Sequence, residues 1–476
     1  MAQYKRLLQK SSLYFVGNFS SKLVNVALIP LYAYALSSDA LGVYDYLLML
    51  MSALGPFAFL AIWEAVLRYT IIKENHEQYK VIGTLEITFF SMVIGILILM
   101  FAGGLIFPSN FEYIILVCIM IICDGAAKVW QSFARGLEQN KDYVLSSIVS
   151  TLLNFLINVI LLCVFHMGYY ALFLAYTISQ LTVMLFLEWK VKVLRYFKKR
   201  YWDPTLLKEM FVFSIPLVVN LSSVWLITGY GRTVVFAELG TISAGIYAFA
   251  SKFGTIILTV GSVFSLALIE EAIIQSKEEG FSSYFSDVLK KIVETLFILL
   301  VLLVPVISVF YHMITNTEYA SSIILFPVFL FYAVIISLST SVGAVFQAVN
   351  KTKYQAVSTI IGSIVAVVLT HLFIGIWGIA GVAIAQTLGA ITMLMLRIHA
   401  AYKYANIKIE YFKPTAWLAV FIVTSILCVK ASLIYIILCF IGLLAVICIV
   451  KKEDINKIYI GILGKRKKML RERGLD

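Results

Sequence analysis

Residues 11–46 read SSLYFVGNFSSKLVNVALIPLYAYALSSDALGVYDY, and this stretch decides the fold class. Residues 13–36 form a nearly continuous apolar run whose one charged residue is Lys22, and the short segment SSDA separates this run from the next. A helix of about 20 apolar residues crosses the hydrocarbon layer of a bilayer. The stretch therefore predicts one membrane-spanning helix, a tight turn and the start of a second spanning helix.

Apolar runs of this length recur along the whole chain. Of its 476 residues, 61% are hydrophobic and 13% charged, whereas soluble domains have about 45–50% and about 25%. The sequence therefore predicts an all-α integral membrane protein with about 14 transmembrane helices and almost no soluble part. The expected spans are Leu13–Leu36, Leu41–Tyr69, Thr84–Phe107, Phe111–Phe133, Val144–Phe165, Gly168–Trp189, Phe211–Leu239, Ser243–Ile273, Ile292–Phe310, Ala320–Ala348, Val357–Ile376, Gly378–Leu396, Ala416–Val429 and Leu433–Val450.

Four short motifs return in the same order in the second half of the chain. Asn18-Phe-Ser-Ser returns as Asn220-Leu-Ser-Ser, and Gly42-Val-Tyr as Gly245-Ile-Tyr. An even number of spans separates each pair, so the repeat is parallel and predicts two pseudo-symmetric six-helix lobes around a central cavity. Chance recurrence in a chain rich in Leu, Ile, Val and Ser is the alternative. The other two pairs are Gln139-Asn-Lys-Asp-Tyr143 with Asn350-Lys-Thr-Lys-Tyr354, and GYYALFLAYT from Gly168 with GIAGVAIAQT from Gly378.

This repeat predicts how the chain divides into parts. Residues 1–197 are expected to form the N-lobe with helices 1–6, and residues 211–404 the C-lobe with helices 7–12, joined by a cytoplasmic linker at 198–210. Residues 405–450 then supply two further helices, and residues 451–476 a basic cytoplasmic tail that contacts anionic lipid headgroups. Topology signalling alone is an equally good explanation of the tail.

The net charge of +12 reflects membrane topology rather than nucleic-acid binding, because the basic residues are spread between the apolar runs. With the N-terminus inside, 34 of the 38 Lys and Arg residues fall in inner segments, as expected of cytoplasmic loops. Both termini are therefore predicted to be cytoplasmic, in a bacterial-type inner membrane, with no cleaved signal peptide.

No motif in the sequence indicates enzymatic chemistry or a bound cofactor. The chain contains no Gly-x-x-x-x-Gly-Lys-Ser/Thr loop, and its six cysteines lie in apolar runs without metal-ligand spacing. The short outer loops also disfavour a membrane enzyme that needs an outer domain for its acceptor. We therefore expect a transporter without cofactors, driven by a proton or sodium gradient and by the membrane potential.

The ordered set of segments resembles a known family, the oligosaccharide and O-antigen flippases. These Wzx-type polysaccharide transporters share a superfamily with multidrug extruders and the lipid II flippase. The resemblance covers about residues 10–405. It rests on the opening stretch, on Arg68, on ARGLEQNKDYVLSSIVSTLLNFLINVILL from Ala134, and on FSIPLVVNLSSVWLITGYGRTVVFAELGTISAGIYAFASKF from Phe213.

This resemblance implies a substrate and partners. The substrate would be a polyprenyl-pyrophosphate-linked oligosaccharide, moved from the inner to the outer leaflet by alternating access during cell-surface polysaccharide assembly. Membrane lipids, glycan polymerases and glycosyltransferases would be the partners. One position departs from the family pattern: Gly231 precedes Arg232 where relatives often carry an acidic residue, which places ion coupling at that position in doubt.

Charged residues inside the spans are the candidate cavity residues, because a cation in the bilayer needs a partner or a wet cavity. Lys22 shares a helix face with Asn18 at i,i+4, and Lys252 lies where the lipid II flippase carries a basic residue that contacts substrate. For Lys22 and Arg232, a side chain extended to the membrane interface is the alternative; for Arg68, it is an ion pair with Glu64. The predicted substrate-binding residues are Asn18, Lys22, Arg68, Asn220, Arg232 and Lys252.

A second set of polar residues lies on one helix. Asp124, Lys128, Gln131 and Arg135 follow one another at spacings of four, three and four, and so form one polar stripe. The stripe either lines an inner vestibule or contacts a neighbouring helix. Three further ionisable residues lie within spans: Glu86 and Glu294 are possible proton sites, and His371 is expected to be a packing residue.

Two other functions remain open at this point. A multidrug or organic-cation extruder of the same fold would need acidic cavity residues, whereas the deep charges here are mainly Lys and Arg. A membrane polysaccharide polymerase or ligase would need larger outer loops. Pyrophosphate is an anion that cationic side chains neutralise, so the flippase is the preferred prediction.

Overall fold

The protein is all-helical in the part of the chain that the computed structural model describes, which comprises residues 24, 26–72, 75–275, 280–349, 351–407 and 412–450. Asn18 and Lys22 lie outside the described residues. The helical segment Val26–Ala35 precedes α2. The α-helices are α2 Ser38–Ala58, α3 Ile62–Ile72, α4 Asn75–Ile106, α5 Phe111–Gly136, α6 Asn140–Cys163, α7 Tyr169–Val191, α8 Pro204–Thr228, α9 Tyr230–Gln275, α10 Phe281–Met313, α11 Phe326–Ala348, α12 Thr352–Ala405, α13 Phe412–Lys430 and α14 Leu433–Val450; the 3₁₀ turns are η1 Pro108–Asn110, η2 Val193–Tyr196, η3 Lys199–Tyr201 and η4 Glu318–Ile324.

Ten of the described helices are long and apolar enough to cross a membrane. Two of them, α9 with 46 residues and α12 with 54, would extend roughly 70 and 80 Å if they were straight. Each is broken by a glycine with positive φ: Gly240 has φ 81°, and Gly378 has φ 56° and ψ −135°. Each of these two helices therefore contains a sharp bend.

Gly378 has a counterpart with the same backbone conformation. Gly168, which precedes α7, has φ 58° and ψ −136°. Only glycine adopts such angles readily. The two glycines start the matching motifs GYYALFLAYT and GIAGVAIAQT, so the sequence match at this point has a structural counterpart.

Two of the expected spans are interrupted by breaks in the helix. The span expected at Leu41–Tyr69 is divided into α2 and α3 by Leu60 and Ala61, whose φ angles are 48° and 49°. At this break the Pro56 carbonyl accepts a wide-turn hydrogen bond from the Ala61 N–H at 3.0 Å. The span expected at Phe211–Leu239 is divided into α8 and α9 at Gly229.

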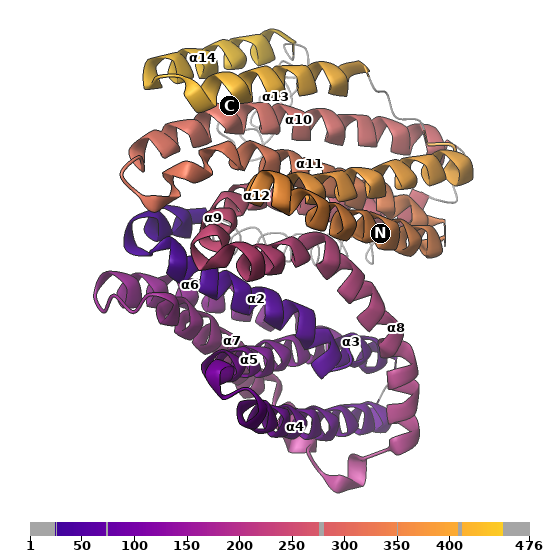
Figure 1. Cartoon of the computed structure of the whole chain (residues 1–476). Coiled ribbons are helices and arrows are strands. Elements are labelled where there is room, and N and C mark those ends of the chain that lie inside the picture. Colours follow the sequence, from indigo (N-terminus) through magenta and orange to yellow (C-terminus); the bar gives the residue numbers. More distant parts are fainter. Residues whose placement is uncertain are drawn as a thin grey trace, which may run out of the picture. The chain divides into compact units, whose positions relative to one another are not determined.

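The described helices belong to two compact units. In the first, residues 1–289 and 316–408, α2 packs along α9, α9 packs along α11, and α11 packs along α12; α5 packs against α3 and α7 (Figure 1). The second unit comprises residues 290–315 and 409–476, and within it α13 packs against α14. These units divide the chain at other positions than the predicted lobes, and the lobe boundaries remain a prediction.

The crossing of α2 and α9 is unusually close. A Cβ atom on Gly42 would lie 1.9 Å from the Thr241 carbonyl oxygen, and one on Gly245 would lie 1.7 Å from the Ser38 carbonyl oxygen. No side chain fits at either position. Gly42 and Gly245 are the matching glycines of the sequence repeat, so the two copies of this motif contact each other.

Polar contacts tie the first turn of α2 to the elements beside it. The Glu318 Oε2 atom of η4 accepts hydrogen bonds from the Ser38 N–H at 2.7 Å and the Ser38 hydroxyl at 2.5 Å. The Tyr319 hydroxyl donates to the Leu36 carbonyl at 3.1 Å, and the Thr241 hydroxyl donates to Asp39. The start of α2 is thereby held to both α9 and η4.

Candidate functional site

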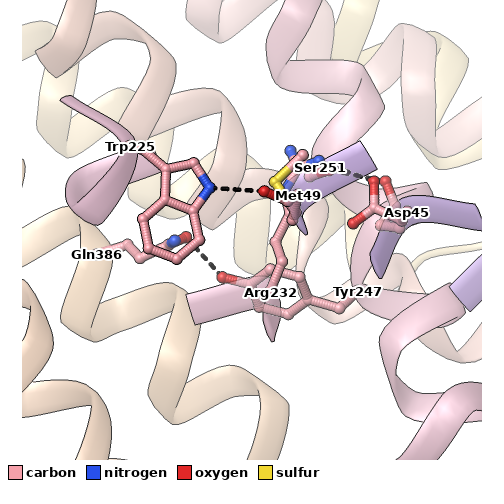
Figure 2. A network of polar contacts seen from close by, with 8 residues as sticks. Asp45, Met49, Trp225, Arg232, Tyr247, Ser251 and Gln386 are labelled. Atoms are coloured by element: carbon pink, nitrogen blue, oxygen red, sulfur yellow. Dashed lines mark hydrogen bonds and ion pairs between the residues drawn. The ribbon is translucent and has the colours of Figure 1, made fainter. Parts of the chain in front are cut away.

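An ion pair joins α2 to α9 inside the first unit. The Arg232 Nη1 atom donates to Asp45 Oδ1 at 2.9 Å, and the Asp45 side chain is only 7% exposed (Figure 2). Asp45 lies one turn beyond the Gly42 crossing, where the two backbones are close enough for this contact. The pair compensates two charges that would each be costly to bury alone.

Two neutral hydrogen bonds lie beside this ion pair (Figure 2). The Trp225 indole N–H donates to the Met49 carbonyl at 3.0 Å, which links α8 to α2. The Tyr247 hydroxyl donates to Gln386 Oε1 at 2.6 Å and so connects α9 to α12. Four helices therefore meet around Arg232.

Gly231 leaves the space that Gln386 occupies. A Cβ atom on Gly231 would lie 2.7 Å from Val382 and 2.8 Å from Gln386 Nε2. Any larger residue at this position would require the Val382 and Gln386 side chains to shift. The carboxylate partner of Arg232 comes from Asp45 on α2.

Lys252 lies in a cavity of about 380 Å³ in the same unit. Its amine is 4.9 Å from the centre of the Tyr32 ring, and it is within electrostatic range of Asp45 and Arg232. The opposite wall, from α6 and α7, consists of hydroxyl and amide side chains. The lining residues are Leu28, Tyr32, Tyr44, Leu48, Ser150, Thr151, Asn154, Tyr176, Ser179, Gln180, Lys252 and Thr255.

This arrangement can bind a polar anionic group. A lysine ammonium neutralises phosphate or carboxylate oxygens through charge-assisted hydrogen bonds, and Ser, Thr, Asn, Gln and Tyr side chains both donate to and accept from hydroxyl groups. The cavity therefore combines one cation with many groups that suit sugars.

Two other predicted cavity residues, Arg68 and Asn220, do not line this cavity. The Arg68 guanidinium stacks on the Phe213 ring at 4.3 Å, which links α3 to α8, and the exposed Asn220 lies on α8. No ion pair between Arg68 and Glu64 is found among the described residues. The substrate-binding roles of Arg68 and Asn220 remain predictions.

The polar stripe of α5 contacts its neighbouring helices. Asp124 accepts from the Tyr176 hydroxyl at 2.8 Å and from Gln180 at 3.3 Å, and it pairs with Lys128 at 2.6 Å. Tyr176 and Gln180 also line the Lys252 cavity, so Asp124 supports the cavity wall from behind. The vestibule role remains a prediction. The remaining contacts join Lys128 to Trp63, Gln131 to Ser147 and Arg135 to Tyr143.

Sequence reasoning missed Asp45 and the polar cavity wall. Asp45 lies within an expected span, in the motif GVYDY, and the rule applied to Lys22 and Lys252 also selects it. The wall residues Ser150, Thr151 and Asn154 follow an i, i+1, i+4 spacing on one face of α6. That weak signal becomes a cavity wall only when α6 is packed opposite α9.

Comparisons with known proteins support a transporter fold. The profile of a family described as polysaccharide biosynthesis protein matches residues 7–269. No curated protein matches the sequence. Among solved structures, the lipid II flippase MurJ in an inward closed conformation is 14% identical to this chain, with a TM-score of 0.69. The match covers 94% of this chain and 100% of the MurJ chain. An inward-facing multidrug resistance MATE transporter of the MOP superfamily is 16% identical, with a TM-score of 0.61. This match covers 86% of this chain and 95% of the MATE chain.

Proposed function

Because the chain belongs to the polysaccharide biosynthesis protein family and is a multi-pass integral membrane protein with the MOP-superfamily fold, we propose that it is a flippase. Its substrate is a polyprenyl-pyrophosphate-linked oligosaccharide, which it moves from the inner to the outer leaflet for cell-surface polysaccharide assembly. It works by alternating access as a transporter, without enzymatic chemistry or a cofactor.

The proposed architecture has about 14 transmembrane helices in a bacterial-type cytoplasmic membrane. Two six-helix lobes surround the cavity, two further helices follow, and both termini are cytoplasmic. The shared conformation of Gly168 and Gly378 and the contact between Gly42 and Gly245 support the twofold repeat. The asymmetric distribution of Lys and Arg supports the orientation.

The observation that carries the proposal is the position of Lys252. This lysine, with Arg232 in electrostatic range, faces a wall of hydroxyl and amide groups across a cavity of about 380 Å³. In the proposal, Lys252 neutralises the pyrophosphate, the polar wall binds the first sugars, and the polyprenyl tail stays in the bilayer. Lys22 and Asn18, Arg68 and Asn220 contribute further contacts as the lobes rearrange.

The driving force follows from the charge of the substrate. An inside-negative potential favours outward movement of an anion by about 2.3 kcal/mol per charge per 100 mV. A proton or sodium gradient then resets the empty carrier. The glycosyltransferases that make the substrate and the polymerase that consumes it are the proposed partners.

The experiment that tests this function measures the leaflet in which lipid-linked oligosaccharide accumulates. Deletion of the gene is expected to trap the lipid-linked oligosaccharide in the inner leaflet, and the wild type is expected to restore export. Lys252→Glu is expected to reduce export at least tenfold, because it places a carboxylate against the pyrophosphate. Lys22→Glu is tested alone and with Lys252→Glu, and the double variant is expected to abolish export.

Lys208→Glu is the matched control, because this exposed lysine of α8 undergoes the same charge change and does not line the cavity. It is expected to export like the wild type. If deletion of the gene leaves the leaflet distribution of lipid-linked oligosaccharide unchanged, the flippase assignment is overturned. In that case, efflux of a radiolabelled drug tests whether the protein is a multidrug extruder. A change in polymer length while export of the lipid-linked oligosaccharide stays intact would indicate a polymerase or ligase.

A further inference from the structure

A second cluster of ionisable side chains connects α9 to α12. The His371 Nε2 atom lies 2.7 Å from the Tyr230 hydroxyl, and its Nδ1 atom lies 3.6 Å from Glu238 Oε1. Tyr230 and Glu238 are eight residues apart on α9, so both side chains can reach the same neighbouring helix. Both ring nitrogens of His371 thus face a titratable group, which does not fit a histidine that only packs.

The ionisable side chains of this cluster are only partly covered by other residues of the protein. The side chains of His371 and Glu238 are 50% and 45% exposed, although both residues lie in helices long and apolar enough to span a membrane. Ionisable residues in such helices usually mark ion pathways or proton relays. A histidine is also the side chain whose charge ordinarily changes between about pH 5 and 8.

The chemistry of the cluster favours a proton over a metal cation. Hard cations such as sodium prefer several oxygen ligands, whereas here an imidazole separates one carboxylate from one phenol. Among the described residues, no group of three or more His, Cys, Asp or Glu side chains could hold a metal.

Other charged groups on this helix and on the helices packed against it are held elsewhere. On α9, Arg232 pairs with Asp45 of α2, and Lys252 faces the cavity. On α12, Arg397 is held by Ser339, Gln355, Ser358 and Thr359. Among the residues whose side chains the structure describes, the remaining charged groups are Asp39 of α2, bonded to Thr241; Glu318 of η4, bonded to Ser38; Lys208 and Glu209 in the first turns of α8; and Lys353, His399 and Lys403 towards the two ends of α12.

A protonation change at His371 alters the contact with Tyr230. When the ring is neutral with its proton on Nδ1, the Tyr230 hydroxyl donates to Nε2. When the ring gains a second proton, Nε2 donates to the Tyr230 oxygen, and the imidazolium pairs with Glu238. One bound proton therefore reverses the direction of the hydrogen bond to Tyr230 and adds one positive charge.

Tyr230 lies where that change can reach α2. Its ring packs edge-on against Trp225, with ring centres 6.1 Å apart, and the Trp225 indole donates to the Met49 carbonyl of α2. Gly229 lies between these two aromatic residues at the break that separates α8 from α9. Discontinuous helices of this kind form the coupling-ion sites of many transporters.

We propose that His371, Glu238 and Tyr230 form a proton-binding site whose occupancy changes the packing of α2 through Trp225 at the Gly229 break. The coupling ion of this protein is then a proton. The site is distinct from the Lys252 cavity and does not depend on the identity of the transported substrate.

The test follows conformation as a function of pH, without substrate. Spin labels at Lys141→Cys and Lys351→Cys, in a variant whose six native cysteines are replaced, report the distance between two exposed loop-end positions of the first unit in lipid nanodiscs. In the wild type, the ratio of the two distance populations is expected to change at least about fivefold between pH 8 and pH 5.5. In His371→Gln, the change is expected to fall below about twofold.

Two partner variants separate binding from coupling. Glu238→Gln removes the acidic partner, so the midpoint of the distance change is expected to move to lower pH. Tyr230→Phe is expected to leave proton binding intact, seen as titration of the ¹⁵N-histidine resonance of His371, but to remove the distance change. These variants and the wild-type resonance also test the proposal if His371→Gln does not fold.

Two control variants test competing proton sites. His312→Gln changes a histidine whose ring bonds to the Ser308 carbonyl, and Glu86→Gln changes a buried carboxyl without a hydrogen-bond partner among the described residues. Both are expected to keep the wild-type pH response. A full response in His371→Gln, or its loss in Glu86→Gln alone, overturns the proposal. Because no substrate is present, this result is independent of the flippase test.

Discussion

Arg232 and Asp45 show how one residue far along the chain determines the role of another. The two lie 187 residues apart in sequence, and their contact exists because α2 and α9 cross at two glycines. Breaking a buried ion pair leaves one charge without compensation, which is more destabilising than removing both charges. The pair is therefore a stability determinant as well as a part of the site.

We expect Arg232→Gln to lower the free energy of unfolding by about 3 kcal/mol, since it leaves the buried Asp45 carboxylate unpaired. The double variant Asp45→Asn/Arg232→Gln is expected to recover most of this loss. Thermal unfolding in detergent measures both. Lys128→Gln is the matched control and is expected to cost less than about 1 kcal/mol, because the Lys128 side chain is 41% exposed in its pair with Asp124. Equal losses in Arg232→Gln and the double variant contradict the prediction.

The contact between Glu318 and Ser38 is expected to depend on pH. The hydroxyl and backbone N–H of Ser38 donate to the Glu318 carboxylate and hold its pKa below the ordinary value. The contact therefore stabilises the association of α2 with η4 fully above the ordinary pKa of glutamate, about 4.3, and this stabilisation is lost as the pH falls through the lowered pKa. At neutral pH, Glu318→Gln is expected to raise, by about two- to fivefold, the population of molecules in which α2 and η4 are apart.

Spin labels at Met167→Cys and Ser321→Cys measure this separation, because Met167 precedes Gly168 beside Ala40 and Ser321 lies on η4. The difference between Glu318→Gln and the wild type is expected to vanish at the lowest pH, where Glu318 itself is protonated. Glu209→Gln on the exposed start of α8 serves as the control. A difference that persists at low pH rules out the ionised carboxylate as its cause.

At the scale of elements, the glycines decide where helices approach and where they break. Gly42 and Gly245 allow the backbones of α2 and α9 to touch, and Gly240 and Gly378 bend α9 and α12. Arg397 shows the complementary case of a buried cation that pins helices: it donates to the Ser339 carbonyl of α11 at 2.7 Å and to two hydroxyls of α12. Close packing and specific polar contacts together hold these elements in place.

We expect Gly42→Ala and Gly245→Ala each to destabilise the protein by about 1–3 kcal/mol or more, because the added methyl group overlaps a backbone carbonyl. Gly95→Ala is the control, since a Cβ atom there meets nothing within 4 Å. This helix-interior change is expected to raise the free energy of unfolding by about 0.5–1 kcal/mol. Thermal unfolding measures these changes. A loss of stability in Gly42→Ala and Gly245→Ala with a gain in Gly95→Ala supports the close crossing, and equal changes in all three variants contradict it.

At the scale of the whole molecule, the alternation of spans and basic loops predicts topology. Lys141 and Lys351 lie in corresponding segments of the two copies of the repeat, one residue apart in register, and Met167 and Trp377 precede the matching glycines Gly168 and Gly378. If the repeat is parallel, members of each pair face the same side of the membrane. The distribution of Lys and Arg assigns the first pair to the cytoplasm.

Membrane-impermeant maleimide is expected to label Met167→Cys and Trp377→Cys in intact spheroplasts. Lys141→Cys and Lys351→Cys are expected to react only after permeabilisation. Each variant is made without the native cysteines, and total reactivity in detergent controls for expression. Labelling of Lys141 and Lys351 from opposite sides would falsify the parallel repeat.

Much of the architecture was predictable because the membrane constrains each spanning segment by its own local sequence. A helix must satisfy its own backbone and present about 20 apolar residues to lipid, so the all-helical class, the membrane location and the family resemblance follow from local composition and motif order. The rule that a cation inside a span requires an explanation also singled out Lys252, which lines the cavity; its role in substrate binding stays a prediction.

Contacts between distant helices were decided by the tertiary structure alone. Nothing local in the sequence pairs Asp45 with Arg232, brings Glu238 to His371, or sets the α6 hydroxyls opposite Lys252, because each contact depends on the angle and register at which helices cross. The breaks at Leu60 and Gly229 were missed for a related reason: apolar composition is unchanged across them, and backbone conformation there is set by packing. The sequence by itself determined what can lie in the membrane, and the packing of helices decided which charges meet there.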